Sequence, residues 1–398
     1  MATREATNRK GRTARIVLVV ALVLLLLPPG LYLGINAALR GPAPPPAFTE
    51  RDLPALPPPD TNGWAVVAEN DHRAFRGIDT PTEVLALCRH EDETADRIPP
   101  HSEVTARLEV MRAFVARRVH EAAVAELHRA LEKPTFVDAC SLAIGADCPL
   151  TELARAHHLG ESEVLIALVE GRGVEAIDEA GRLFRASLSY AGAPRSPVAA
   201  VLSVTLLRRD VELGARLVAG LEASAAPRTP ELEAAVRAYA ARYDQLAEAP
   251  LSMRTAIVGD YVSMRSMVLP IFEGGGAAGT DLGLLGRVKV FTDPRDSMRR
   301  LDRYYVAMVA FAGGHGRATP PMPDSGAHAR GWWLRNPGGK TLLDLGMSNM
   351  APTVVRYEAM VRQVQERRVV VEGALRRWLE GAAVPVGAQP PSRPADAH

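Results

Sequence analysis

The stretch "TVVRYEAMVRQVQERRVVVEGALRRW", residues 353 to 378, carries the pattern that decides the fold class. Its apolar side chains recur alternately three and four residues apart, at Val354, Tyr357, Val361, Val364, Val371, Leu375 and Trp378. This spacing is typical of a helix whose apolar seam docks along another helix, and Arg368 interrupts the seam once. We expect a helix over about 352 to 380. Docking on another helix of the same chain is favoured over a coiled-coil dimer.

Helical periodicity continues through most of the region from 61 to 382. Helices are expected at about 102–133, 150–158, 161–190, 196–223, 229–247 and 251–268, with a further helix beginning at Asp293-Pro294. An aspartate followed by proline is a favourable helix start, because the side chain caps the first turn and proline suits its first position. Only "RVKVF", residues 287 to 291, resembles a strand. The sequence therefore predicts a large all-α domain of stacked antiparallel helices.

An apolar segment near the N-terminus, "RIVLVVALVLLLLPPGLYLG" at residues 15 to 34, predicts a membrane anchor. Residues 16 to 39 would form a helix of about 36 Å, enough to cross a hydrocarbon core of about 30 Å. The alternative is a cleaved signal peptide. Signal cleavage needs small residues at positions −3 and −1. A cut after Ala37 would place Ile35 at −3, so a retained transmembrane helix is favoured.

Charge around this segment predicts the topology. Residues 1 to 15 carry Arg4, Arg9, Lys10, Arg12 and Arg15 against Glu5. By the positive-inside rule, this basic tail stays cytoplasmic and everything after residue 40 faces outward. A strong preference for arginine over lysine, with abundant alanine and proline, resembles the output of a GC-rich bacterial genome. We therefore expect a bacterial inner-membrane protein whose main domain is periplasmic.

Proline marks the ends of the main domain. Residues 40 to 60, containing "GPAPPPAFTERDLPALPPPD", are expected to form a stiff, extended linker that holds the domain away from the bilayer. Residues 383 to 398 at the C-terminus are polar and rich in proline, which predicts a disordered tail. The large helical domain is thus expected between residues 61 and 382.

Two cysteines give the clearest chemical prediction. Cys140 and Cys148 flank Gly145, which permits a tight reversal of the chain. Outside the cytoplasm such a pair can form a disulfide, whereas the plainer interpretation is two small buried thiols. The bond requires the helix to break between them, because eight helical positions would separate them by about 12 Å. Cys88 is interpreted as a buried apolar residue.

A long irregular segment, residues 313 to 339, offers the candidate catalytic and interaction residues. In an enzyme, Asp324 and one of the histidines His315 and His328 would form an acid–base pair. The alternative, which we favour, is that Trp332 and Trp333 fasten the segment to the helices or meet a partner, with the polar residues solvated.

The remaining motifs favour no metal, cofactor or nucleic acid. His120 and Glu121 begin a metalloprotease-like motif, but Val124 stands where the second histidine is required. The glycine-rich stretch 273 to 283 lacks the Lys-Ser/Thr of a phosphate-binding loop. Net charge is +1, and residues 1 to 15 hold the excess, so the main domain has no basic field for nucleic acid.

The stretch "NPGGKTLLDLGMSN", residues 336 to 349, together with the long helix after it, resembles the C-terminal part of membrane-anchored helical bacterial proteins of unassigned function. The similarity covers about residues 250 to 380. It implies a helical fold and a membrane location, and it implies no activity.

These observations predict a non-catalytic interaction or assembly protein of the envelope, with an unidentified protein partner and a membrane contact through residues 16 to 39. One alternative is an envelope hydrolase that uses the segment 313 to 339. Another is a tetratricopeptide-like peptide binder, which requires a concave groove lined by residues 161 to 247.

Overall fold

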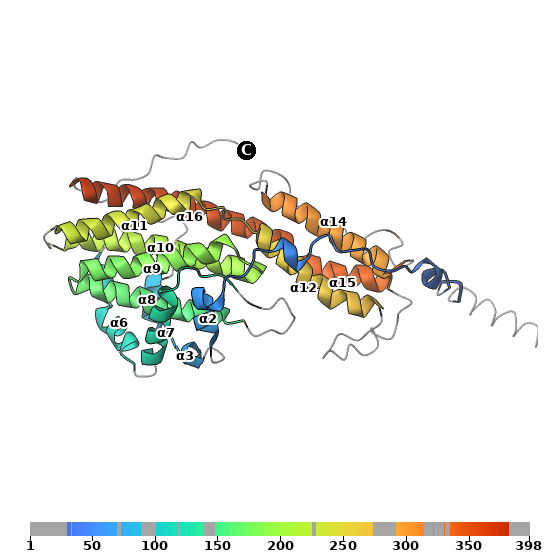
Figure 1. Ribbon diagram of the computed structural model, residues 1–398, viewed down its shortest axis with the longest axis horizontal. Coiled ribbons are helices and arrows are strands. Elements are labelled where there is room, and N and C mark those ends of the chain that lie inside the picture. Colours follow the sequence, from blue (N-terminus) through green and yellow to red (C-terminus); the bar gives the residue numbers. More distant parts are fainter. Residues whose placement is uncertain are drawn as a thin grey trace, which may run out of the picture. The chain divides into compact units, whose positions relative to one another are not determined.

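The computed structural model describes residues 30–32, 34–69, 73–88, 101–117, 120–138, 140, 148–224, 228–273, 292–313, 321, 330 and 335–381. Every regular element within these ranges is a helix (Figure 1), and one isolated bridge joins Asn62 to Thr135. The prediction of an all-α fold is confirmed. The strand-like stretch 287 to 291 lies outside the described residues.

The chain divides into two compact units. The first comprises Met1–Phe48, Tyr261–Met308 and Pro320–Ala351, and the second comprises Thr49–Asp260, Val309–Thr319 and Pro352–His398. This division differs from the single domain that the sequence predicts over 61 to 382.

Four long helices form the centre of the second unit: α8 (Leu150–Val169), α9 (Gly173–Gly192), α10 (Pro197–Ala223) and α11 (Pro230–Glu248). Helix α9 contacts the other three (Figure 1). Phe184 on α9 lies against Tyr239 and Tyr243 on α11, with ring centroids 6.1 and 5.0 Å apart. Burial of these aromatic side chains supplies much of the apolar stabilisation of the unit.

The ends of these helices follow local chemistry. Ser196 caps α10, since its hydroxyl accepts a hydrogen bond from the backbone N of Ala199 at 3.1 Å. Gly171, with φ of +78°, follows the end of α8. The sequence places a boundary near residue 160, but Gly160 is helical. A Cβ there would lie 2.9 Å from the side chain of Leu183, so this glycine allows two helices to approach closely.

Short helices precede the long ones in the second unit. They are η1 (Glu50–Asp52), η2 (Pro59–Thr61), α2 (Gly63–Ala68), α3 (Arg73–Arg76), α4 (Thr82–Cys88), α5 (His101–Thr105), α6 (Leu108–Val115) and α7 (Glu121–Leu131). The prediction of a single helix over 102 to 133 is wrong. The chain forms three shorter helices there, α5, α6 and α7. His120 sits at the second break, where its buried ring Nδ1 lies 2.8 Å from the carbonyl of Phe114. The same carbonyl also accepts a hydrogen bond from the backbone N of Arg117, at 3.5 Å.

Helix α16 (Met350–Glu380) extends over the length that the heptad pattern predicts. The predicted seam residues Val354, Tyr357, Val364, Val371, Leu375 and Trp378 are buried, but at two places the buried residue is the preceding one. Met360 and Arg367 are buried, whereas Val361 and Arg368 are only half-buried. Gln365 donates a hydrogen bond to the carbonyl of Leu246 on α11, at 3.1 Å, so the seam docks on helices of the same chain.

Helices α12 (Arg254–Glu273), α14 (Pro294–Gly313), α15 (Pro337–Met347) and the start of α16 contribute residues to the first unit. Helix α14 begins at Pro294 as predicted, and the side chain of Asp293 accepts from the backbone N of Arg295 at 3.0 Å. Tyr304 on α14 donates to the carbonyl of Met347 at the end of α15, over 3.0 Å.

Asn336 fixes the start of α15 in the first unit. It is buried and has a φ of +51°, a conformation that asparagine tolerates better than most residues. Its side chain accepts from the backbone N of Asp293 at 2.9 Å and donates to Asp296 and Ser297, each at 2.9 Å. The Asn-Pro-Gly-Gly motif therefore ties the start of α15 to the start of α14.

The proline-rich segment differs from the free linker that the sequence predicts. Residues 41 to 48 lie against α12 within the first unit. The carbonyl of Pro44 accepts a hydrogen bond from Arg265, and the backbone N of Ala47 donates to the hydroxyl of Tyr261 at 2.9 Å. Proline keeps this segment extended, which leaves its backbone groups available to helix side chains. We call residues 41 to 48 the strap.

Residues 30–32 and 34–39 are helical, and residues 16 to 29 of the expected anchor lie outside the described residues. None of the helices in the described part of the chain combines the length and hydropathy needed to cross a membrane.

Candidate functional site

Cys140 and Cys148 form a disulfide in the second unit, with their Cα atoms 5.6 Å apart. This separation lies within the range of about 4.4 to 6.8 Å that a disulfide requires. Asp138 is buried beside the bond, and one of its oxygens accepts from the backbone N of Cys140 at 2.7 Å. Burial raises the pKa of the Asp138 carboxyl.

Asp138, Cys140 and Cys148 also bring three potential metal ligands together. A metal would need the cysteines as thiolates, and the disulfide removes both thiolates. We therefore assign this group a structural role. Cys88 ends α4, and its side chain is outside the described residues.

All of the candidate residues in the segment 313 to 339 lie outside the described residues. These are the catalytic candidates His315, Asp324 and His328 and the interaction candidates Trp332 and Trp333. The geometry of this segment therefore does not enter the site described below.

A buried charged network lies between α8 and α10. His157 is 3.0 Å from Asp210 through Nε2 and 3.3 Å from Glu161 through Nδ1, and all three side chains are almost inaccessible to solvent. Burial disfavours the charge of His157, but the two carboxylates outweigh it and raise its pKa to about 10. His157 is therefore protonated at neutral pH and neutralises part of the buried negative charge.

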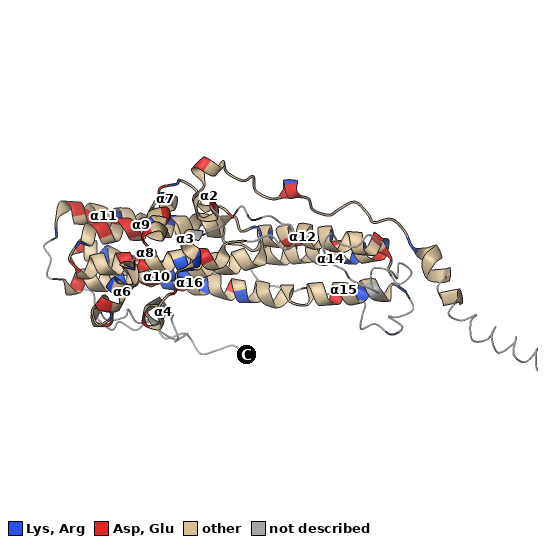
Figure 2. Ribbon diagram, turned by 90° about the horizontal axis from the view of Figure 1, so that it is seen from below, with Lys and Arg blue, Asp and Glu red and all other residues tan. Residues whose placement is uncertain are grey.

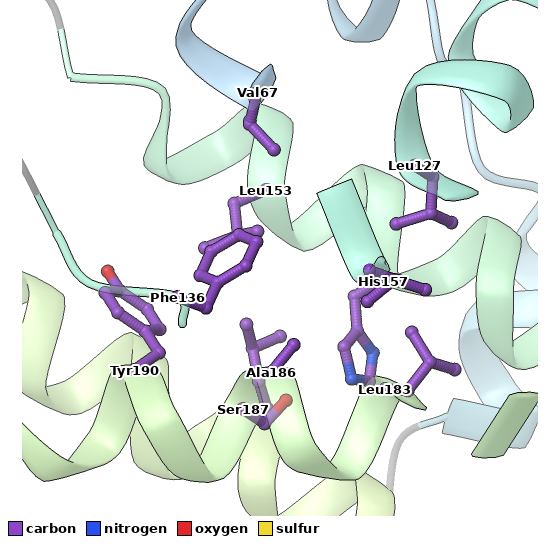
Figure 3. A pocket seen from close by; sticks show the side chains of 11 residues that line it. Val67, Leu127, Phe136, Leu153, His157, Leu183, Ala186, Ser187 and Tyr190 are labelled. Carbon is purple, nitrogen blue, oxygen red and sulfur yellow. The ribbon is translucent and has the colours of Figure 1, made fainter. Parts of the chain in front are cut away.

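A small cavity adjoins this network, and Figure 3 shows His157 and Ser187 among the apolar side chains that line it. Its volume is about 20 Å³, room for about one water molecule. Ser187 lines the cavity together with His157. In a Ser-His-Asp hydrolase a neutral histidine accepts the serine proton, whereas this histidine already holds its proton. The network is consequently a core feature that links α8 to α10.

A larger recess, of about 100 Å³, lies between α9 and α11. It is lined by Ile177, Asp178, Gly181, Arg182, Arg185, Ala235, Ala238, Tyr239 and Arg242. We call it the α9–α11 groove. Gly181, Ala235 and Ala238 have small side chains, which opens the space between the two helices. Ile177, Ala235 and Tyr239 are buried, whereas Asp178, Arg182 and Ala238 are exposed.

Three arginines give the groove its positive charge. Arg182 lies 3.3 Å from Glu179, with about half of its side chain exposed. Arg185 donates a hydrogen bond to the carbonyl of Leu131, and Arg242 donates to Gln245 at 3.1 Å. Neither Arg185 nor Arg242 forms an ion pair with a carboxylate in the part of the chain that the structure describes. Burial first, and then the neighbouring charges of Arg242 and Arg182, lower the pKa of Arg185.

Several arginines outside the groove are paired with nearby carboxylates. Figure 2 shows acidic and basic residues interspersed along the helices. Arg112, for example, lies 2.8 Å from both Glu109 and Glu170. Sequence reasoning did not single out the groove residues. A signal exists in the spacing of Arg182 and Arg185, which places both on one face of a helix, but Arg242 joins them only through tertiary packing.

No protein-family model matches the chain, and neither the curated proteins nor the solved structures contain a match.

Proposed function

We propose that the chain is a membrane-anchored, non-catalytic binding protein of the bacterial envelope, whose second unit lies outside the cytoplasm and engages a protein partner through the α9–α11 groove. Residues 16 to 39 are the anchor in this proposal, with residues 1 to 15 in the cytoplasm.

The observation that carries the binding role is a recess lined by three arginines from two helices, of which Arg185 and Arg242 form no ion pair among the described residues. Positive charges that repel each other at a partly buried site are costly, and a ligand with opposite charge relieves that cost. The residues that line the groove lie between 177 and 242 in the sequence. The tetratricopeptide-like alternative requires its concave binding surface within residues 161 to 247. The groove therefore supports a peptide-binding role more than an assembly role, for which no site is defined.

The disulfide between Cys140 and Cys148 supports the extracytoplasmic location. Such bonds form and persist in oxidising compartments and are rare in the cytoplasm of mesophiles. The location also agrees with the topology expected from the basic residues that precede the apolar segment.

Site-specific photo-crosslinking in cells tests the binding role. A photo-reactive amino acid at Ala238, which lines the groove and is exposed, should give an adduct with an envelope protein. The same amino acid at Ala241, exposed on α11 but outside the groove lining, is the matched control and should give none. An equal yield at both positions, or no adduct at Ala238, would contradict the proposal.

The hydrolase alternative depends on the segment 313 to 339 and predicts a different outcome. If the chain is a hydrolase, replacing Asp324 with Asn would abolish the function of the protein and leave the Ala238 crosslink unchanged. If the cellular phenotype of the gene deletion is rescued by Asp324→Asn but not by groove variants, the binding role stands and the hydrolase is excluded.

A further inference from the structure

We propose that the α9–α11 groove recognises a carboxylate-rich, acidic peptide segment. This inference rests on the proposed binding function and specifies the chemistry of its partner. It is carried by the lining of the groove, where three arginines from two helices surround a recess whose floor is apolar.

Arg182 and Arg185 lie one turn apart on α9, and Arg242 faces the same recess from α11. A guanidinium presents a planar fork of N–H donors that matches the two oxygens of a carboxylate. Arg185 donates a hydrogen bond to a backbone carbonyl, and Arg242 donates one to a side-chain amide oxygen. Each guanidinium retains further N–H donors for a ligand.

The floor of the groove can hold the uncharged part of a ligand. Ile177, Ala235 and Tyr239 form a buried floor, and Gly181 leaves room above it. The methylene groups of a glutamate side chain can lie on such a floor while its carboxylate reaches the arginines.

The size of the recess favours an acidic side chain over an anionic lipid. The groove of about 100 Å³ suits single side chains better than a bulky phospholipid headgroup. Asp178 lines the same groove, but the three arginines outnumber it, so a carboxylate is still attracted. An acidic peptide therefore matches both the charge and the size of the groove.

Fluorescence anisotropy with the full-length protein in detergent tests the inference. The probe is a short fluorescein-labelled polyglutamate peptide, and polyglutamine of equal length is the control probe. We expect saturable binding of polyglutamate only, weakening as salt rises, because screening reduces the attraction between exposed charges. Arg242→Gln should weaken binding about fivefold or more. Arg237→Gln, an exposed arginine on α11 outside the groove, should leave it unchanged.

Arg185→Gln is a second variant, and circular dichroism shows whether its helices remain intact, because Arg185 also contacts the carbonyl of Leu131. Equal binding of the two peptides, or loss with Arg237→Gln as large as with Arg242→Gln, would overturn the inference. If the protein binds anionic phosphatidylglycerol vesicles more tightly than it binds polyglutamate, the groove would instead be assigned to lipid. If the Ala238 crosslink forms in cells but polyglutamate does not bind, the binding function survives and the acidic ligand is rejected.

Discussion

Arg367 donates two hydrogen bonds to Glu212, over 2.8 and 2.9 Å, and thereby joins α16 to α10 through side chains that are both largely buried. A bidentate arginine–carboxylate pair fixes both the distance and the rotation of the two helices. The position of α16 in the second unit is therefore set by a specific pair as well as by its apolar residues.

Breaking this pair should destabilise the second unit. Arg367→Met leaves Glu212 as a buried charge without its main partner, and the loss should be about 3 kcal/mol in free energy of unfolding. Urea denaturation measures it. The double variant Arg367→Met with Glu212→Gln should recover part of the loss. A double variant that loses the sum of the two single effects would show that the residues act independently.

Arg368 is the matched control for Arg367. It bonds to Gln365 and forms an ion pair with Glu372, both on its own helix, and Arg376 gives Glu372 a second partner. Pairs of this kind contribute about 0.5 kcal/mol. Arg368→Leu should therefore change the free energy of unfolding by less than about 1 kcal/mol. A loss as large as that of Arg367→Met would mean that Arg368 belongs to the seam after all.

The buried His157 predicts a dependence of stability on pH. Its pKa rises from 6.5 to about 10 on folding, so the folded state binds the proton more tightly than the unfolded state. The stabilisation is complete below pH 6.5 and is lost as the pH rises toward 10. The free energy of unfolding should fall over that interval, measured by urea denaturation at a series of pH values. His157→Gln should flatten the curve, and an unchanged slope would contradict the protonated assignment.

Gly339 tests the role of Asn336 in the first unit. A Cβ at residue 339 would lie 2.2 Å from both Asn336 Oδ1 and Ser297 Oγ, atoms that are held by hydrogen bonds. Gly339→Ala should cost about 1–3 kcal/mol through overpacking. Gly192→Ala is the control, because a Cβ there meets no atom within 4 Å. Equal thermal midpoints for the two variants would show that the Asn336 contacts can rearrange without cost.

The sequence predicted helices best where local signals mark their ends. Pro294 with its Asp293 cap, and the heptad spacing of α16, identified two helices closely. The register of the α16 seam was harder to predict, because positions 360 and 361 are both apolar and their burial depends on what faces them. The breaks between α5, α6 and α7 lack proline or glycine, so no such residue marks them in the sequence. At the second break, His120 contacts the carbonyl of Phe114.

The groove and the strap were missed for the same reason. The proline-rich strap has the composition of a free linker, and its attachment depends on Arg265 and Tyr261, more than two hundred residues later in the chain. In the groove, Arg185 and Arg242 come together only when α9 packs against α11. The disulfide could be considered from the sequence alone, because Cys140 and Cys148 are close in the chain and a short loop restricts the arrangements they can adopt.

The disulfide gives a further prediction about stability. Closing the short loop between Cys140 and Cys148 restricts the unfolded chain and should contribute about 2–3 kcal/mol. The double variant Cys140→Ala with Cys148→Ala should lose this amount in urea denaturation, and a reducing agent should produce a similar loss in the native protein. No response to either change would mean that the loop is already ordered without the bond.

We propose that the chain stays in the membrane by its N-terminal segment and exposes the second unit to an oxidising compartment. Intact-mass analysis of the protein extracted from membranes under non-reducing conditions tests both properties at once. We predict a mass that retains residues 1 to 40 and that rises by two hydrogen atoms on reduction. A mass that lacks the N-terminal segment would contradict the membrane anchor, and a mass that does not change on reduction would contradict the disulfide.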